Sequence, residues 1–164
     1  MNAFPILQST RCVMSCITDE DISVMQQIFD DDLTRKFLPE LIPLVRTDKG
    51  IRQMLSSLNA LFTQDEGIIW AIRLENTVIG FAAVMDLTDS PTILYAIHPN
   101  YRQKGYMKEC IDVIINYILD KTQCSYIQSE VYIENTPSMH LLQSIGFKVK
   151  KKYSRKVLLR RELK

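Results

Sequence analysis

The sequence predicts a single α/β domain, residues 1–164, built around a mixed sheet of about seven strands. The 164 residues are 46% hydrophobic and 24% charged, an ordinary composition for one globular domain with one core. Apolar runs of strand length alternate with runs whose apolar residues recur at helical spacing. Residues 92–133 read as strand, helix and strand, an order that places the two strands side by side and parallel.

Three helical segments are predicted in the first third of the chain. Thr18 with Asp21 marks the start of the first, because a side-chain oxygen there accepts a hydrogen bond from an unpaired amide. Thr47 or Asp48 marks the start of the third in the same way. The predicted elements are a strand at residues 11–17, a helix ending near Phe29, a short broken helix within residues 33–45, which hold two prolines, and a helix with Ile51, Met54, Leu55 and Leu58 on its apolar face.

Strands dominate the rest of the chain. Glu75 and Asn76 join two strand-like runs and suit a tight hairpin turn. Gly146 suits the left-handed residue that often ends a helix. The predicted elements are strands at residues 68–74, 77–87, 92–98, 126–133, 147–153 and 154–163, a helix at residues 106–121, and a helix that begins at Asn135 or Thr136 and ends before Gly146.

A short basic loop joins a predicted strand to the helix at residues 106–121, and it reads Arg102-Gln103-Lys104-Gly105-Tyr106-Met107. Most such loops are only turns. This one also suits phosphate binding, because the first amides of a helix lack partners and the helix dipole adds positive charge there. Backbone amides alone can then hold an anion, and Gly105 has no Cβ to keep a ligand away.

The composition argues against several classes of protein. No apolar run approaches the roughly 20 residues that span a bilayer, and no signal peptide is predicted. The net charge is only +1 and no nucleic-acid motif is present. The four cysteines form no Cys-x-x-Cys pair, so free thiols in a reducing compartment are favoured over a metal site. We therefore expect a cytoplasmic protein with no metal, membrane or nucleic-acid partner.

Charge is distributed unevenly along the chain. From Lys148 to the C-terminus there are nine Lys or Arg residues and one acid, so this segment carries +8 and the remainder −7. The basic segment suits either a solvated terminal hairpin or a surface that attracts an anionic partner or phosphates. The acidic run Asp30-Asp31-Asp32 suits either a solvated loop or a site that attracts a positively charged amine.

Further motifs lie on both sides of the basic loop. Downstream, Asn135-x-x-Ser138-x-x-Leu141-Leu142 runs on to Gly146-Phe147. Together with the pattern Arg-x-x-Gly-x-Met in the loop, this order and spacing resembles the GNAT superfamily of N-acetyltransferases. The segments Thr10-Arg11-Cys12-Val13-Met14 and Phe37-Leu38-Pro39 are similar to the RimJ/RimL branch, the ribosomal-protein N-terminal acetyltransferases and their relatives. The resemblance runs from about Thr10 to about Tyr153.

The resemblance implies a fold and a coenzyme site. The fold would be the acyl-CoA N-acyltransferase fold, with splayed middle strands and helices on both faces of the sheet. The pantetheine arm of acetyl-CoA would lie in the gap and the pyrophosphate at the loop, with Arg102 and Lys104 either beside the phosphates or solvated. The implied coenzyme-binding residues are Tyr95, Ala96, Ile97, Arg102, Gln103, Lys104, Gly105, Tyr106, Met107 and Asn135.

The implied activity is transfer of an acetyl group to a primary amine by direct attack in a ternary complex. The acceptor is either a protein N-terminus or a small-molecule amine, and the protein would be a monomer or a homodimer. The alternative is a non-catalytic acyl-CoA-binding or regulatory module of the same fold. Two departures from the family pattern favour this alternative. Leu142 replaces a tyrosine that often protonates the departing thiolate, and Met107 replaces a glycine or alanine beside the phosphates.

Two residues are candidates for catalysis. In the RimJ/RimL branch the position of Ser138 implies a hydrogen-bond donor to the thiolate, although a serine there can also bond only to the backbone. Glu130 is the candidate base for the amine, because strand alternation puts it on one face with Gln128 and Tyr132. It also suits a solvent-facing or ion-paired glutamate. His98 directly precedes Pro99 and is interpreted as a surface residue rather than a base.

Overall fold

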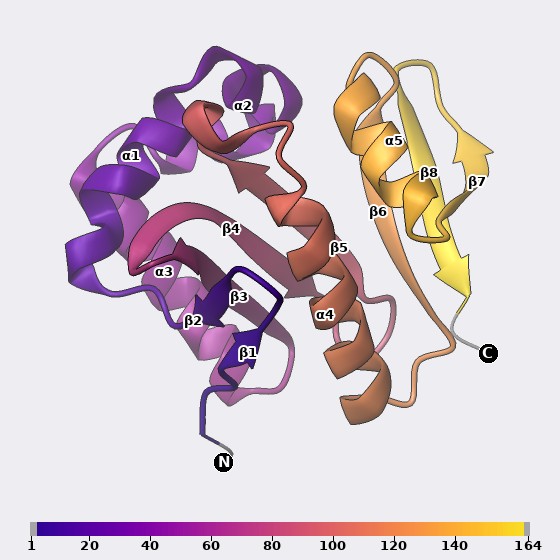
Figure 1. The fold of residues 1–164 in the computed structure, drawn as a ribbon, viewed down its shortest axis with the longest axis horizontal. Helices are drawn as coiled ribbons and strands as arrows, with labels where there is room; N and C mark the ends of the chain where they lie inside the picture. Colours follow the sequence, from indigo (N-terminus) through magenta and orange to yellow (C-terminus); the bar gives the residue numbers. More distant parts are fainter. Residues whose placement is uncertain (1–2, 163–164) are drawn as a thin grey trace.

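A computed structural model describes residues 3–162, whose strands form one sheet in the order β1-β2-β3-β4-β5-β6-β8-β7. All neighbouring strands are antiparallel except β5 and β6, which are parallel. In Figure 1 the sheet falls into two parts, with β1–β5 on the left and β6, β8 and β7 on the right. Helix α4 runs along the boundary between them, and α5 lies over the right-hand part.

The longest strands are β3 and β4, which form the central hairpin. They are β1 Leu7–Gln8, β2 Val13–Ser15, β3 Gly67–Leu74, β4 Thr77–Met85, β5 Thr92–Ile97, β6 Tyr126–Tyr132, β7 Lys148–Lys152 and β8 Lys156–Glu162. The helices are α1 Ile22–Asp30, α2 Asp32–Phe37, α3 Asp48–Thr63, α4 Tyr106–Lys121 and α5 Thr136–Ser144, with 3-10 helices η1 Asp19–Asp21, η2 Pro39–Leu44 and η3 Pro99–Tyr101. No helix within residues 3–162 is long and apolar enough to cross a membrane.

The predicted starts of the helices and the predicted hairpin turn are confirmed. Asp21 Oδ2 accepts a hydrogen bond from the Thr18 amide at 2.8 Å, and Thr47 Oγ1 accepts one from the Gly50 amide at 3.0 Å. Glu75 and Asn76 both have positive φ, at 49° and 69°, as a two-residue hairpin turn requires. These features are local in sequence, so the sequence alone identifies them.

Strand β1 was not predicted, so the sheet has eight strands rather than about seven. It is two residues long, too short to show an alternating pattern, and it pairs with β2 through Leu7 and Met14. The residues just before β1 are held by Trp70 of β3, whose Nε1 donates a hydrogen bond to the Pro5 carbonyl at 3.0 Å. The N-terminal segment is therefore held by tertiary contacts and not by its own strand propensity.

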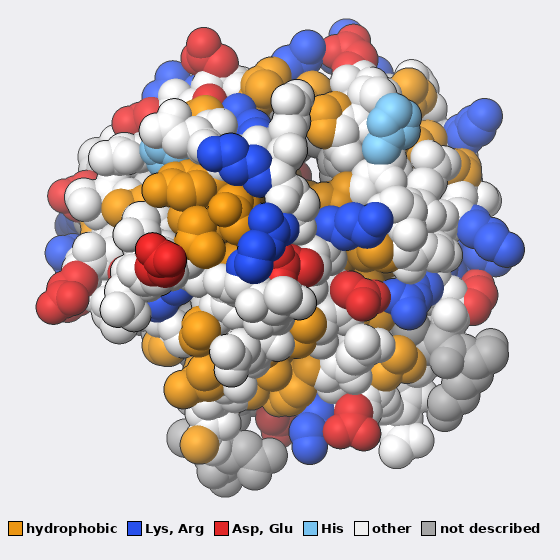
Figure 2. Space-filling view, viewed as in Figure 1, with side chains coloured by type: hydrophobic (Ala, Val, Ile, Leu, Met, Phe, Trp, Pro, Cys, Tyr) orange, Lys and Arg blue, Asp and Glu red, His pale blue; other side chains and the backbone are white. Residues whose placement is uncertain are grey.

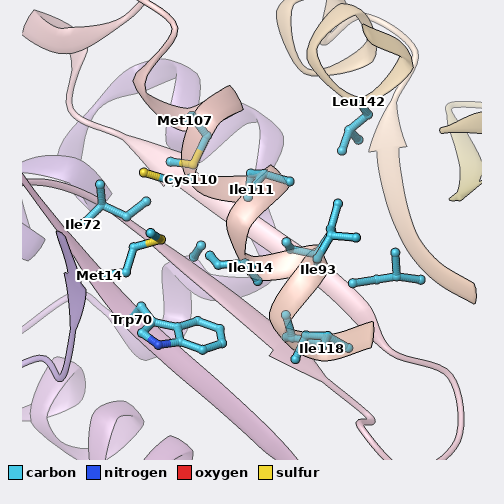
Figure 3. Packing of buried hydrophobic residues seen from close by; sticks show 14 of the residues in the cluster. Met14, Trp70, Ile72, Ile93, Met107, Cys110, Ile111, Ile114, Ile118 and Leu142 are labelled. Carbon is cyan, nitrogen blue, oxygen red and sulfur yellow. The ribbon is translucent and has the colours of Figure 1, made fainter. Parts of the chain in front are cut away.

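Two clusters of buried apolar side chains lie on opposite faces of the sheet. The first is packed between the sheet and helices α4 and α5, and Figure 3 shows the α4 side chains that enter it. Met107 is 5% exposed and points into this cluster on the same side of α4 as Cys110 and Ile111 (Figure 3). The second cluster joins α1 and α3 to β3, β4 and β5, and it includes Met25, Ile28, Ile51, Phe81 and Ala96.

Strands β5 and β6 meet at only one place. Thr92 and Gln128 are their register pair, and the Gln128 amide donates to the Pro91 carbonyl at 2.9 Å. One residue further along, Ser129 Oγ donates to the Ile93 carbonyl at 2.9 Å. Beyond that bond the strands diverge, as the resemblance implied, and the gap between them is where the candidate site lies.

A buried ion pair connects β3 to the start of α1. Arg73 Nη1 and Nη2 donate to Asp21 Oδ1 and Oδ2 at 2.9 and 2.7 Å, and the two side chains are only 19% and 7% exposed. Arg73 also donates hydrogen bonds to Ser15 Oγ, at the end of β2, and to the carbonyl of Cys16, the residue that follows β2. Burial alone would raise the pKa of Asp21, but the hydrogen bonds from Arg73 and Thr18 hold it below its usual range.

Asp21→Asn should lower the free energy of unfolding by about 3–5 kcal/mol at neutral pH, because it leaves the Arg73 charge buried without its partner. The pKa of Asp21 is lower in the folded chain than in the unfolded chain. The advantage of the parent is therefore complete above about pH 4 and is lost as the pH falls through the folded-state pKa. Urea unfolding of both proteins at about pH 7 and about pH 3 measures this difference.

Asp19→Asn is the matched control, because Asp19 pairs with Arg52 in an ion pair whose side chains are 87% and 50% exposed. It should change stability by less than about 1 kcal/mol at either pH. If the stability difference between the parent and Asp21→Asn stayed constant down to about pH 3, the buried ion pair would not be its cause.

Candidate active site

A cavity of about 780 Å³ opens where β5 and β6 diverge. Its volume lies within the range of small-molecule sites. It is lined by α2, β5, the loop before α4 with its first turn, and the segment from β6 into α5. Both candidate catalytic residues, Ser138 and Glu130, line it, and so do all the predicted coenzyme-binding residues except Lys104. The structure thus brings together residues that lie more than forty positions apart in the sequence.

Backbone groups of β5 face the cavity. The Ile93 carbonyl points toward β6, because it accepts the hydrogen bond from Ser129. Backbone direction alternates along a strand, so the N–H and C=O groups of Tyr95 and Ile97 also point toward β6. There β6 has already diverged, and the register pair of the two strands within residues 3–162 lies back at Thr92. Because a buried unpaired backbone group costs about 1–3 kcal/mol, this edge suits a ligand that supplies hydrogen bonds.

The loop before α4 presents further amides to the cavity. Gly105 is the residue before the helix and has φ +82°, a left-handed conformation that glycine adopts without strain. The amides of Tyr106 and Met107 begin the helix and have no partner within it. Figure 2 shows that Lys and Arg side chains gather on this face around the boundary between the two parts of the molecule. The loop therefore combines free amides, the positive end of a helix and nearby cations.

Arg11 supports this loop from the N-terminal segment. Its Nη2 donates to the Lys104 carbonyl at 2.8 Å, and its Nε donates to Glu109 Oε1 of α4 at 2.5 Å. Its guanidinium lies 4.2 Å from the centre of the Tyr106 ring. A Cβ on Gly105 would lie 3.2 Å from Arg11 Nη2, so a larger residue there would press on this support. Arg11 thus fixes the loop in the conformation that exposes its amides.

The two basic side chains of the loop have partners within the protein. Arg102 Nη2 forms an ion pair with Asp31, and the two side chains are 26% and 14% exposed. Lys104 Nζ donates to the Asn100 carbonyl at 3.3 Å and lies 5.8 Å from the centre of the Tyr101 ring. Arg102 therefore connects the loop to the start of α2. The amides of Tyr106 and Met107, in contrast, have no partner within α4.

Asp31, the middle residue of the acidic run Asp30-Asp31-Asp32, has partners within the protein, whereas Asp30 and Asp32 are exposed. Asp31 accepts a hydrogen bond from the Thr34 amide at 3.0 Å and so caps α2, in addition to its ion pair with Arg102. Burial alone would raise the pKa of Asp31, but these partners hold it below its usual range. Asp30 is also paired, with Arg35 at 3.0 Å. Both alternatives from the sequence are thus wrong for Asp31, whose partner lies 71 positions away.

A short hydrogen bond joins the two sides of the cavity. Tyr95 Oη of β5 lies 2.5 Å from Ser138 Oγ in the first turn of α5. Burial raises the pKa of Tyr95 to about 12, so its hydroxyl remains protonated at neutral pH. The Ser138 amide is capped separately by Asn135 Oδ1 at 3.4 Å. The Ser138 hydroxyl is therefore directed across the gap and is not merely bonded to the backbone of its own helix.

Glu130 lies on the opposite face of the sheet from Ser138. Ile127, Ser129 and Val131 alternate with it along β6 and are buried on the face covered by α4 and α5, whereas Glu130 is exposed. Around it the cavity is lined by Leu94, Tyr132 and residues of α2, and the Phe37 ring packs 6.3 Å from the Tyr132 ring. The cavity thus has a Ser138 side and a Glu130 side, separated by the plane of the sheet.

Two other residues that the sequence singled out, Leu142 and His98, lie outside the cavity lining. Leu142 is fully buried in the core beneath α5 (Figure 3) and does not line the cavity. His98 Nδ1 accepts a hydrogen bond from the Asn100 amide at 3.2 Å, and its Nε2 lies 3.2 Å from Gln27 Oε1. His98 therefore stabilises the start of η3 and lies outside the cavity lining.

Sequence reasoning missed the contacts that hold the site together. The pairs Arg11–Glu109, Arg102–Asp31 and Tyr95–Ser138 join residues 98, 71 and 43 positions apart, and no local pattern signals such partners. The apolar lining of the Glu130 side comes from Leu33, Phe37 and Leu38, in the segment of residues 33–45 that the family resemblance places beside the acceptor site. Residues 3–162 hold no group of three His, Cys, Asp or Glu side chains placed to bind a metal ion.

Comparison with known proteins identifies the family of this chain. A family model described as an acetyltransferase (GNAT) domain matches residues 11–148. An uncharacterised N-acetyltransferase of Bacillus subtilis, YoaA, is 29% identical over 150 residues, which cover 88% of this chain and 83% of that protein.

Solved structures show the same fold. The Salmonella typhimurium acetyltransferase that modifies the N-terminal serine of ribosomal protein L7/L12 has a TM-score of 0.82 at 11% identity, covering 96% of this chain and 99% of that one. Mycobacterium smegmatis RimJ, solved in complex with CoA-disulfide, has a TM-score of 0.78 at 16% identity, covering 97% and 86%. With the family match over most of its length, this chain belongs to the GNAT acetyltransferase family.

Proposed function

We propose that this chain transfers an acetyl group from acetyl-CoA to a primary amine, which attacks the thioester directly in a ternary complex. The observation that carries the proposal is the cavity between β5 and β6. It offers unpaired strand amides, helix amides and a hydroxyl pair on one side and a carboxylate on the other. The acceptor is either a protein N-terminus, as for the L7/L12 acetyltransferase that shares the fold, or a small amine.

The residues present fit acetyl-CoA. The amides and carbonyls of Tyr95 and Ile97 can pair with the two amide groups of the pantetheine arm, as a further strand would. The amides from Gln103 to Met107 can hold the pyrophosphate at the start of α4. Met107 does not obstruct this role, because its side chain is packed in the core and leaves its amide at the loop. CoA-bound relatives of the same fold support the use of an acyl-CoA.

The reaction forms one C–N bond and breaks one C–S bond. The lone pair of the neutral amine attacks the thioester carbonyl carbon, and the bonding electrons of the C–S bond leave with sulfur. Glu130, on the acceptor side, takes the proton that the ammonium must lose, directly or through water. The attacking nitrogen gives up a second proton as the amide forms, and the thiolate takes up one proton to become the free thiol, both by exchange with water. Ser138 donates a hydrogen bond to the departing thiolate. Either hydroxyl of the Tyr95–Ser138 pair can be the donor, and the proposed step uses the arrangement in which Tyr95 donates and the serine hydrogen points into the cavity. Positioning of the reactants supplies most of the acceleration.

The alternative function is a non-catalytic acyl-CoA-binding module. The observation that favours it is the identity of residue 142. This residue is a buried leucine, which cannot donate a proton, at the position where many GNAT enzymes have a tyrosine as the acid. Thiol release from acetyl-CoA, measured with a panel of small amines and N-terminal peptides, distinguishes the two. Amine-dependent release supports the enzyme, and coenzyme binding without release for any acceptor supports the module.

Gly105→Asp should abolish the rise in melting temperature that acetyl-CoA causes, because it puts bulk and negative charge beside the pyrophosphate. Differential scanning fluorimetry with and without acetyl-CoA measures the rise. Gly146→Asp is the matched control, since Gly146 is also left-handed, with φ +97°, but lies outside the cavity lining. Equal stabilisation of the parent and Gly105→Asp by acetyl-CoA would refute the loop assignment.

Ser138→Ala should lower kcat about 10–100-fold with little change in coenzyme affinity, because a hydrogen bond to a charged group contributes about 1.5–3 kcal/mol. Tyr95→Phe should lower kcat less, and the double variant should be no slower than Ser138→Ala, because Tyr95 acts only through Ser138. Steady-state kinetics with isothermal titration of coenzyme A measures both effects. Additive losses in the double variant would show that the two hydroxyls act independently.

Glu130→Gln should reduce the rate most at low pH, where the amine is mainly protonated and needs a base. At high pH, where neutral amine is abundant, much of the lost rate should return. A pH–rate series on the parent and the variant, with one acceptor amine, provides the measurement. The same fractional loss at every pH would mean that Glu130 has a structural role and does not act as a base.

A further inference from the structure

One face of the strands β6, β8 and β7 is left uncovered. Partners across antiparallel strands share a face, so the register carries the face of Glu130 onto β8 and β7. None of the side chains on this face is buried, and neither hydrophobic core includes one of them among residues 3–162. We call it the open face. It consists of Tyr126, Gln128, Glu130, Tyr132, Lys156, Leu158, Arg160, Glu162, Lys148 and Lys151.

The open face is positively charged. Its two acids are Glu130, the candidate base, and Glu162, which is paired with Lys150 at 3.1 Å. Two of its cations lie against aromatic rings of β6. Lys156 Nζ is 4.7 Å from the centre of the Tyr132 ring, and Arg160 Cζ is 3.8 Å from the centre of the Tyr126 ring. The cations of the open face are Lys148, Lys151, Lys156 and Arg160.

The positively charged open face adjoins the Glu130 side of the cavity, where the acceptor amine is proposed to bind. Glu130 and Tyr132 line the cavity and also belong to the open face, and Lys156 lies across from Tyr132 on the next strand. On the other side the acceptor region is bounded by α2, where Phe37 packs near Tyr132 and Lys36 pairs with Glu134 at 3.1 Å. A peptide whose N-terminal amine lies at Glu130 can therefore extend over β8 and β7 without meeting another element of the protein.

The spacing of the strands sets which residues of such a chain meet the cations. Neighbouring strands lie about 4.8 Å apart, so β7 lies about 10 Å from β6. An extended peptide advances about 3.3–3.6 Å per residue. Residues at about positions 3 to 5 of an acceptor peptide would thus lie over β8 and β7, within reach of long Lys and Arg side chains.

We propose that the preferred acceptor is a polypeptide N-terminus with acidic residues at about positions 3 to 5, which lies across the open face. The inference rests on the proposed function for the transfer step, and on the charge of the open face for the preference. Because the cations are partly or fully exposed, their attraction is of the screened, long-range kind that raises affinity at low salt.

The test uses matched octapeptides with the same first two residues and with Asp, Ser or Lys at positions 3 to 5. The value of kcat/KM from thiol release should be about tenfold higher for the Asp peptide than for the Lys peptide at low salt, from several weak ion pairs acting together. The preference should shrink toward unity at about 0.5 M salt. Moving the acidic residues to positions 7 and 8 should remove most of it.

The double variant Lys148→Glu/Lys151→Glu should reverse or abolish the preference. Lys49→Glu/Lys121→Glu makes the same change in net charge on α3 and α4 and should leave the preference intact. Anisotropy of dye-labelled peptides with coenzyme A present gives the same comparison without transfer, so failure of the reaction and failure of the open face are distinguishable. Equal binding of the Asp and Lys peptides, or equal loss of the preference in both double variants, would overturn the proposal.

Discussion

The whole site depends on the divergence of β5 and β6 after a single register pair. If these parallel strands stayed paired, the backbone N–H and C=O groups of Tyr95 and Ile97 would be hydrogen-bonded to β6 and no cavity would exist. Ser129 sets the point of divergence by donating its hydroxyl hydrogen to the Ile93 carbonyl, which takes the place of a backbone bond. Further along, the Tyr95–Ser138 hydrogen bond spans the opened gap. The two parts of the sheet are thus joined by backbone pairing at Thr92 and Gln128 and, beyond that pair, by side-chain hydrogen bonds.

Long-range ion pairs fix the elements around this gap. Arg11 holds the loop before α4 from the N-terminal segment, and Arg102 holds it from α2 through Asp31. Both basic side chains act on the shape of the loop, which leaves its amides available. The side chains that face an acceptor come instead from α2 and from the open face of β6, β8 and β7. In the proposed function, coenzyme and acceptor therefore contact separate parts of the chain.

The sequence predicted what depends on local patterns. The bounds of α4, the caps at Thr18 and Thr47 and the hairpin turn at Glu75 follow from propensity and spacing, and all are confirmed. The family resemblance located the gap, because no periodicity in β5 or β6 signals that paired strands will part. Strand β1 and the partners of Asp31 and Arg11 could not be predicted, since two residues show no alternation and ion pairs between distant segments leave no local trace.

Hydrogen exchange at individual amides of β5 tests the central claim most directly. The backbone amides of Tyr95 and Ile97 point into the gap, whereas the backbone amides of Leu94 and Ala96 point toward β4, so the strand contains its own control. Coenzyme A should slow the exchange of the Tyr95 and Ile97 amides, and of the Tyr106 and Met107 amides at the start of α4, with little change at Leu94 and Ala96. If coenzyme A binds and the Tyr95 and Ile97 amides exchange as fast as before, the gap between β5 and β6 is not where it binds.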